Sequence, residues 1–268
     1  MNNIKAVFMD LDGTTLREDL TISDNLKEKI NEFEKNGIKF FVSTGRSYKS
    51  SKPYVEELGL RNETITYNGA RIVPANCINN EIYEQPLSKE VVEKLIDVSR
   101  NKKIHLNLYN NDDLYVENNS KEARAYAKGV GIDFILDNFD NFIGKTSTKG
   151  LFIAENRILL ALKEELENII SEVNYVFSKP NYLEVLNKNV NKGKAVQYVL
   201  EKHGISKENA VAFGDQWNDY EMLETVKYGI LMGNAPEELK KKFSKNRITL
   251  SNDEDGIVYM LEKLVEQQ

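Results

Sequence analysis

The fold of this 268-residue chain is decided by a stretch near its start, Ile4-Lys5-Ala6-Val7-Phe8-Met9-Asp10-Leu11-Asp12-Gly13. The apolar run that ends at Met9 predicts a short buried strand, and the polar sequence from Asp10 onward ends it. A helix is expected next, at about residues 23–36, with Ser23 as its N-cap. A second apolar strand is expected at 38–42. Strand, helix and strand in this order indicate a parallel sheet with helical crossovers.

The rest of the chain shows two rhythms. Strands alternate with helices up to about residue 83 and again near the C-terminus, whereas the middle predicts helices on one face of an antiparallel sheet. We therefore predict a Rossmann-like parallel-sheet core made of residues 1–83 and 188–268, interrupted by an inserted α+β domain at 84–187. The further expected elements are helices at 47–58, 88–101, 120–128, 157–170, 194–203 and 219–226, one from Pro236 and one from Gly256, a hairpin at 64–73, and strands at 104–109, 114–117, 150–154, 175–178, 182–186, 210–213 and 229–232.

Composition and charge narrow the class of protein. The chain is 41% hydrophobic and 29% charged, which is ordinary for a globular protein. Its formal net charge is -6, and lysines are interleaved with glutamates, as in Lys27-Glu28-Lys29. Such a chain repels nucleic-acid backbone and anionic lipid, so we expect neither partner.

Cysteine content and the lack of long apolar runs favour a cytoplasmic protein. No run is long enough for a signal sequence or a membrane span. The one cysteine, Cys77, cannot form an intrachain disulfide, which suits a reducing compartment. Neither His105 nor His203 has a spacing that marks it as a base for Cys77, so we expect packing or surface roles for all three.

Polar or glycine-rich sequence follows four of the predicted strands. In an open parallel sheet, ligands gather at the carboxyl ends of the strands, so residues from both ends of the chain should meet in one crevice. The expected site contains Asp10, Asp12, Thr44 and Asp215. Converging carboxylates repel one another and need a cation, and hard oxygen ligands with open positions suit Mg²⁺ and a phosphate. Lys192, just before a predicted helix, could balance the negative charge.

Each of these motifs also has a structural explanation when taken alone. Asp-x-Asp-Gly is common in turns and partly matches a calcium loop, although the later oxygen ligands of such a loop are missing. Thr44-Gly45-Arg46 could be a helix cap, and Lys192-Gly193 carries little information. The fourth motif, Gly-Asp-x-x-Asn-Asp at 214–219, follows an apolar strand and is more specific. All four motifs in order, each at a strand or helix boundary, are hard to attribute to chance.

The complete set resembles the haloacid dehalogenase superfamily of phosphohydrolases, and within it the Cof-type subgroup with a large α/β (C2B-type) cap. The resemblance covers the whole chain. Its motifs are Asp10-Leu11-Asp12-Gly13-Thr14, Ser43-Thr44-Gly45-Arg46, Lys192-Gly193, Gly214-Asp215-Gln216-Trp217-Asn218-Asp219, and three subgroup segments, Tyr67-Asn68-Gly69-Ala70, Met232-Gly233-Asn234-Ala235 and Ser251-Asn252-Asp253-Glu254-Asp255-Gly256. Ser43 departs slightly from the pattern, because a small apolar residue is more usual there.

The resemblance implies a magnesium-dependent phosphatase with an aspartyl-phosphate intermediate. Asp10 would be the nucleophile and Asp12 the general acid and base. Mg²⁺ would be held by Asp10, the backbone carbonyl of Asp12, and Asp215. The phosphoryl oxygens would be bound by Thr44, Lys192, Asn218 and the backbone N–H groups near Leu11 and Gly45. Asp219 would bond a metal-bound water or Lys192, and Arg46 would contact substrate or brace its loop.

The resemblance also makes the inserted segment a cap that closes over the leaving group and selects the substrate. Its expected substrates are small phosphorylated metabolites such as sugar phosphates, pyridoxal phosphate or flavin mononucleotide, and the expected state is a monomer or weak homodimer. Tyr109, Lys145, Lys149 and Tyr182 could line the pocket, although packing or surface roles are expected for each. Two alternatives stay open, a hexose phosphomutase and a catalytically silent metabolite-binding regulator.

Overall fold

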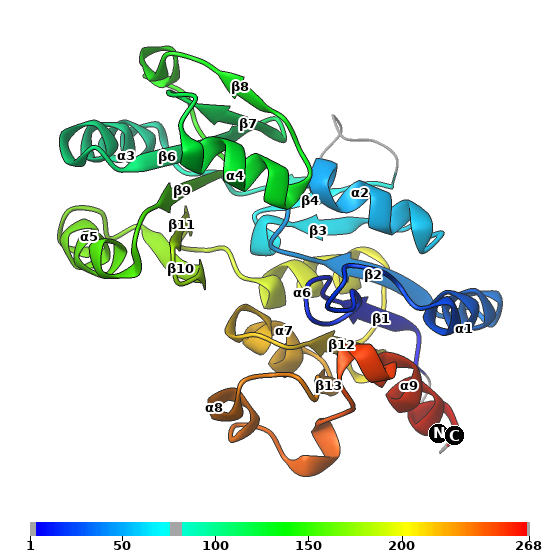
Figure 1. Ribbon diagram of the computed structural model, residues 1–268. Helices are drawn as coiled ribbons and strands as arrows, with labels where there is room; N and C mark the ends of the chain where they lie inside the picture. Colours follow the sequence, from blue (N-terminus) through cyan, green and yellow to red (C-terminus); the bar gives the residue numbers. More distant parts are fainter. Residues whose placement is uncertain (1–3, 76–81, 267–268) are drawn as a thin grey trace. The chain divides into compact units, whose positions relative to one another are not determined.

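The computed structural model describes residues 4–75 and 82–266, and its chain divides into two compact units (Figure 1). One unit comprises residues 1–82 and 191–268, and the other comprises 83–190. The sequence prediction placed these boundaries after residues 83 and 187. Cys77 lies outside the described residues.

The first unit is built on a mainly parallel sheet. Its strands run in the order β13-β12-β1-β2-β3-β4, and every neighbouring pair is parallel except β3 and β4. All four residues of β1 are buried, which agrees with its apolar sequence. The strands are β1 (Ala6–Met9), β2 (Lys39–Ser43), β3 (Thr64–Thr66), β4 (Arg71–Val73), β12 (Ala210–Gly214) and β13 (Tyr228–Leu231). A two-residue strand, β5 (Tyr83–Glu84), lies where the chain passes into the second unit.

Helices complete this unit. The first, α1 (Asp24–Lys35), is capped by the Ser23 side chain and packs Leu26, Ile30 and Phe33 into the core that also contains α9 (Gly256–Glu266). The others are α2 (Tyr48–Glu57), α6 (Lys192–Lys202), α7 (Tyr220–Thr225) and α8 (Glu237–Lys240), with 3₁₀ turns η1 (Tyr67–Gly69), η3 (Lys207–Asn209), η4 (Trp217–Asp219), η5 (Lys245–Arg247) and η6 (Asn252–Glu254).

Two helix starts differ from the sequence prediction. Helix α6 begins at Lys192 rather than Lys194, because the Asn191 side chain caps it by accepting from the Lys194 N–H. Lys192 is therefore in the first turn of the helix instead of before it. Pro236 was expected in the first turn of its helix but is the N-cap of α8.

The second unit is an α+β layer. Its sheet has the order β10-β11-β9-β6-β7-β8, and α3 and α5 pack with it in one apolar core. The elements are α3 (Lys89–Lys102), β6 (His105–Asn110), β7 (Asp113–Val116), α4 (Lys121–Val130), β8 (Phe134–Leu136), η2 (Phe139–Phe142), β9 (Lys149–Ile153), α5 (Asn156–Ile169), β10 (Val173–Lys179) and β11 (Tyr182–Asn187).

The expectation of a purely antiparallel sheet with helices on one face was wrong in two respects. Strand β8, which was not predicted, pairs parallel with β7. Helix α4 lies on the face opposite α3 and α5, because it contacts Tyr109 and Tyr182, whereas Leu108 and Leu183, one residue away along the same strands, belong to the core with α3 and α5.

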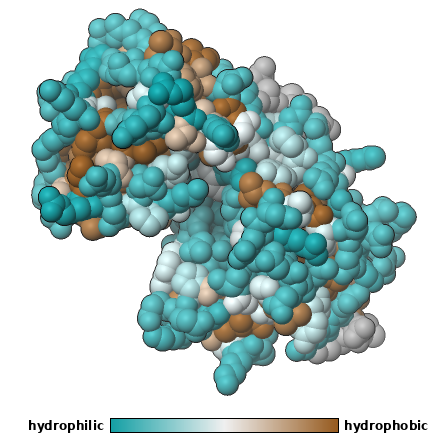
Figure 2. All heavy atoms as spheres, in the orientation of Figure 1, coloured by the Kyte–Doolittle hydropathy of each residue, from teal (hydrophilic) through white to brown (hydrophobic). Residues whose placement is uncertain are grey.

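The surface is mostly polar on the face drawn in Figure 2. Large apolar side chains exposed in the described part of the chain include Leu136 and Ile143 of the second unit and Trp217 of the first. Among the described residues, no helix combines the length and the apolar character that crossing a bilayer requires.

Candidate active site

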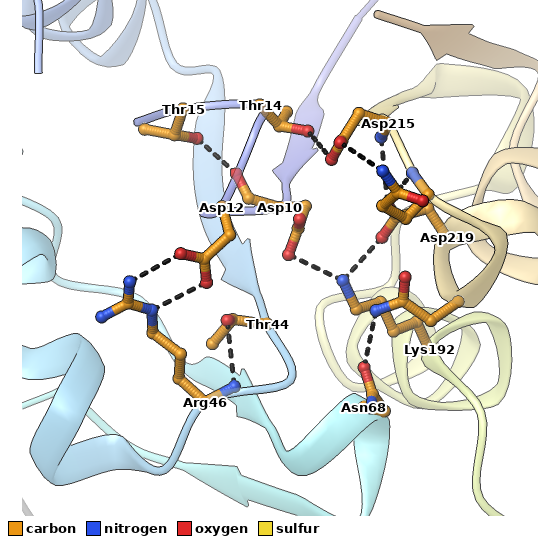
Figure 3. A network of polar contacts seen from close by, with 12 residues as sticks. Asp10, Asp12, Thr14, Thr15, Thr44, Arg46, Asn68, Lys192, Asp215 and Asp219 are labelled. Carbon is orange, nitrogen blue, oxygen red and sulfur yellow. Dashed lines mark hydrogen bonds and ion pairs between the residues drawn. The ribbon is translucent and has the colours of Figure 1, made fainter. Parts of the chain in front are cut away.

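Charged side chains gather at one edge of the parallel sheet in the first unit (Figure 3). Asp10 and Asp12 follow β1, Thr44 and Arg46 follow β2, and Asp215 follows β12. Because these strands are parallel, their carboxyl ends lie at the same edge, which brings together residues that are about 200 positions apart in sequence.

Lys192 is the cation at the centre of this group. Its Nζ lies 2.7 Å from Asp10 Oδ1 and 2.6 Å from Asp219 Oδ1, and its side chain is fully buried. Burial favours the neutral amine, but the charges of Asp10 and Asp219 outweigh it and raise the pKa of Lys192. The lysine is therefore charged and fixed between two carboxylates.

Asp219 has both carboxylate oxygens engaged. Its Oδ1 accepts from Lys192, and its Oδ2 accepts from the backbone N–H groups of Asp215 and Gln216, each at 3.0 Å. Asp219 therefore fixes the loop after β12 as well as the lysine. The sequence offered Lys192 or a metal-bound water as the partner of Asp219, and the structure places Lys192 on its Oδ1.

Asp215 packs closely against Gly13. Thr14 Oγ1 donates to Asp215 Oδ1 at 3.1 Å, and Gln216 Nε2 donates to Oδ2 at 3.2 Å. Gly13 has a φ of +74°, and a Cβ there would lie 2.4 Å from Asp215 Oδ2. A larger residue at position 13 would strain the backbone and require the Asp215 carboxylate to shift.

Three buried carboxylates form a candidate metal site. One oxygen from each of Asp10, Asp215 and Asp219 lies within 4.8 Å of the others. Burial raises the pKa of Asp10 well above its usual range, and the neighbouring carboxylates add to this against the effect of Lys192. Burial, with the charge of Asp219, raises the pKa of Asp215 to about 7. Three carboxylates with one lysine therefore lack positive charge, and a hard divalent cation with oxygen ligands fits this deficit.

Asp12 and Arg46 form a two-point ion pair. Arg46 Nε lies 2.7 Å from Asp12 Oδ2, and Nη2 lies 2.6 Å from Oδ1. The guanidinium also lies over the Tyr54 ring, 5.1 Å from its centre, while the Asp12 side chain is 53% exposed. The structure thus places Arg46 on Asp12, a partner that its sequence did not indicate.

The remaining expected residues lie nearby in the same unit. The Thr44 hydroxyl accepts from the Arg46 N–H at 3.1 Å, and the bare Gly45 lies against the Asn68 amide. Asn218 Nδ2 donates to Asn68 Oδ1 at 2.9 Å. Leu11 is buried at the turn after β1.

Sequence reasoning gave no role to Thr14, Thr15, Gln216 or Asn68. Thr15 Oγ1 donates to the Asp10 carbonyl at 2.5 Å and so braces the turn that carries Asp10. In the sequence, Asn68 belongs to an Asn-Gly turn and to a subgroup segment, neither of which gives its side chain a role. The signal that could have found it is the Asn-Gly pair, which marks a backbone with positive φ.

The second unit contains the four residues that the sequence offered as possible pocket residues, Tyr109, Lys145, Lys149 and Tyr182. Lys149 and Tyr109 are buried: Lys149 Nζ lies 3.3 Å from Glu184 Oε1 and 5.2 Å from the centre of the Tyr109 ring. Lys145 lies over the Phe142 ring, and Tyr182 packs edge-on against Tyr126. Lys149 and Tyr109 thus make packing contacts within this unit, whereas Lys145 is exposed.

Comparison with known proteins identifies the class. The model of the haloacid dehalogenase-like hydrolase family matches residues 7–261, so the chain belongs to this family of hydrolases. An HMP-PP phosphatase of Yersinia pseudotuberculosis is 30% identical over 94% of this chain and 92% of its own length. A 5-amino-6-(5-phospho-D-ribitylamino)uracil phosphatase of Bacillus subtilis is 29% identical over 96% of each chain. The crystal structure of a haloacid dehalogenase-like hydrolase from Bacteroides thetaiotaomicron has a TM-score of 0.88 at 27% identity, covering 97% of this chain and 99% of that one. These curated relatives are phosphatases.

Proposed function

We propose that the protein is a magnesium-dependent phosphatase that hydrolyses phosphomonoesters of small metabolites through an aspartyl-phosphate at Asp10. The observation that carries this proposal is the position of Lys192, fixed at 2.7 Å from Asp10 and 2.6 Å from Asp219 beside a third buried carboxylate, Asp215. A buried cation beside a nucleophilic carboxylate suits phosphoryl transfer, in which positioning and charge stabilisation dominate.

Mg²⁺ would be held by Asp10, Asp215 and the backbone carbonyl of Asp12. Asp219 is assigned no ligand role, because it already accepts from the Lys192 ammonium and from two backbone N–H groups, whereas each oxygen of Asp215 accepts from one neutral side chain. The bound cation would offset the repulsion between the Asp10 carboxylate and an anionic phosphate. Asp219 instead holds Lys192 and the loop after β12 in place.

In the first half of the reaction, a carboxylate oxygen of Asp10 attacks phosphorus. The bond from phosphorus to the leaving oxygen breaks, and that oxygen takes a proton from Asp12. Lys192, Thr44, Asn218 and the N–H groups of Leu11 and Gly45 bind the transferring phosphoryl oxygens. The alcohol leaves, and Asp10 carries the phosphoryl group as an acyl phosphate.

In the second half, Asp12 takes a proton from water as the water attacks phosphorus. The bond between phosphorus and the Asp10 carboxylate oxygen breaks, which regenerates Asp10 and releases inorganic phosphate. Arg46 donates one hydrogen bond to each oxygen of Asp12, and each oxygen keeps a second lone pair for the proton that Asp12 transfers. Arg46 is thus assigned the role of holding Asp12 between transfers.

The substrate class rests on the relatives, which the comparisons name as phosphatases of different small metabolites. We infer that this chain also acts on a small phosphorylated metabolite of the sugar phosphate, pyridoxal phosphate or flavin mononucleotide type. Residues 83–190 would serve as the cap that selects among them.

The test is phosphate release from a panel of sugar phosphates, pyridoxal phosphate, flavin mononucleotide and an aryl phosphate. Each is assayed with Mg²⁺, with chelator, and with Asp10→Asn. The proposal expects release that requires Mg²⁺ and disappears in the variant. Isomerisation of a hexose phosphate without net release would support the mutase alternative instead, and binding without turnover by a folded, Mg²⁺-loaded protein would support a regulator.

A further inference from the structure

The short segment Tyr67–Gly69 has an unusual backbone. Three consecutive residues have positive φ, 51° at Tyr67, 57° at Asn68 and 98° at Gly69. Positive φ is uncommon for residues other than glycine, and such strain persists only where the surroundings hold it. Tyr67 is fully buried and Asn68 nearly so. The segment is therefore held by its contacts.

Those contacts link the segment to two parts of the candidate site. The N–H of Tyr67 donates to the Arg46 carbonyl, and the N–H of Asn68 donates to the Thr44 carbonyl, both at 3.0 Å. On the other side, a Cβ at Gly69 would lie 2.5 Å from the carbonyl oxygen of Asn191, which precedes Lys192. The segment thus packs between the loop after β2 and the start of α6.

The side chain of Asn68 reaches a third part of the site, 150 residues away (Figure 3). Asn218 Nδ2 donates to Asn68 Oδ1 at 2.9 Å. The Asn68 oxygen also fits closely against Gly45, where a Cβ would lie 3.1 Å from it. An amide nitrogen carries two hydrogens, so Asn218 keeps a second N–H for another acceptor.

We propose that Asn68 is a positioning residue for phosphoryl binding. Its carbonyl oxygen holds one N–H of Asn218, which orients the Asn218 amide and leaves the second N–H for a phosphoryl oxygen. The strained backbone places that oxygen correctly because it is anchored to Thr44 and Arg46. This inference rests on the proposed function, in which Asn218 contacts the substrate phosphate.

A double-mutant cycle tests it. Asn68→Gly removes the acceptor, while glycine adopts the same positive φ without strain. We expect this variant to lower kcat/KM for an aryl phosphate about tenfold, the effect of about one hydrogen bond. In an Asn218→Ala background the same change should alter kcat/KM by less than about twofold, because the two residues act as a unit. Equal losses in both backgrounds, or no loss from Asn68→Gly alone, would overturn the proposal.

The double-mutant cycle has a matched control variant and a second measurement, phosphate binding, that does not require catalysis. Asn111→Gly makes the same replacement at a φ of 49° at an exposed position between β6 and β7, and it should leave kcat/KM unchanged. Calorimetric titration with inorganic phosphate measures the same coupling as binding affinity. If the wild type hydrolyses nothing, the proposed function fails, and the affinity cycle still decides the role of Asn68.

A second variant covers the case in which Asn68→Gly does not fold. Asn68→Asp keeps an acceptor oxygen and tolerates positive φ. In this background Asn218→Ala should weaken phosphate binding as it does in the wild type. Loss of that sensitivity would contradict the proposal.

Discussion

Arg46 donates two hydrogen bonds to Asp12, from Nε to Oδ2 at 2.7 Å and from Nη2 to Oδ1 at 2.6 Å. The two side chains come from the ends of adjacent strands, β1 and β2. Tyr54 supports the guanidinium from its face. Asp12, which is assigned to proton transfer, is thus held by the planar guanidinium of Arg46.

We expect Arg46→Lys to lower kcat/KM by about tenfold or more, because a lysine keeps the charge but cannot form the planar two-point contact. The measurement is steady-state kinetics with the preferred substrate and Mg²⁺. Arg100→Lys is the control, since it changes a surface ion pair of the second unit with Glu117. Equal activity of Arg46→Lys and the wild type would show that the function of Asp12 does not depend on its two-point contact with the guanidinium.

Gly13→Ala should abolish phosphate release. The new Cβ would stand 2.4 Å from Asp215 Oδ2, and alanine disfavours a φ of +74°. Gly131→Ala is the matched control: Gly131 has a φ of +69° with nothing within 4 Å of a Cβ. It should lose about 1 kcal/mol of stability and keep its activity. An active Gly13→Ala enzyme would be incompatible with the geometry assigned to Asp215.

The contribution of Asp215 to the stability of the metal-free protein should become less favourable as pH rises from about 4 to about 7. The pKa of Asp215 is about 7 in the folded protein, against 3.8 for an ordinary aspartate, so over this range the folded state binds more protons than the unfolded state. In the presence of a chelator, the free energy of unfolding of Asp215→Asn should therefore exceed that of the wild type by about 1–3 kcal/mol near pH 8. The difference should vanish near pH 4.

Urea unfolding at several pH values, with and without Mg²⁺, checks this. Mg²⁺ should stabilise the wild type above pH 7 and have little effect on the variant. Asp97→Asn, at an exposed position of α3, serves as the control. A wild type whose metal-free stability rises from pH 4 to pH 7 relative to Asp215→Asn would contradict the account.

Glu63 should contribute to stability at neutral pH. It bonds Lys202 at 2.5 Å and His203 at 2.9 Å, and these bonds outweigh burial and lower its pKa to about 2. Its contribution is complete above the unfolded pKa of about 4.5 and is lost as pH falls towards 2. Glu63→Gln should thus cost about 1–2 kcal/mol at pH 7 and almost nothing near pH 2. Glu57→Gln, which alters an exposed pair with Lys27, should cost under about 0.5 kcal/mol.

Sequence alone anticipated the parts of this molecule that depend on local pattern. The apolar run ending at Met9 and the capped helix after Ser23 follow from periodicity and capping. The gathering of Asp10, Thr44 and Asp215 at one edge follows from parallel strands sharing a direction.

Other features depend on tertiary contacts that no local pattern encodes. The Asn68–Asn218 hydrogen bond joins residues 150 positions apart and requires a strained backbone. Strand β8 has only three residues, too few to stand out as a strand, and α4 lies on its face of the sheet because of side-chain contacts with Tyr109 and Tyr182. Helix α6 begins at Lys192 rather than at the predicted Lys194, because the Asn191 side chain caps it.

The most direct test of the central claim is to trap the phosphorylated residue. Wild-type enzyme turning over an aryl phosphate with Mg²⁺ is quenched in acid, reduced with borohydride and digested, and the peptides are examined by mass spectrometry. Borohydride converts an aspartyl-phosphate to homoserine, so the account predicts homoserine at position 10, and none there without substrate or in Asp10→Asn. Homoserine at any other aspartate, or phosphate release by Asp10→Asn at the wild-type rate, would contradict it.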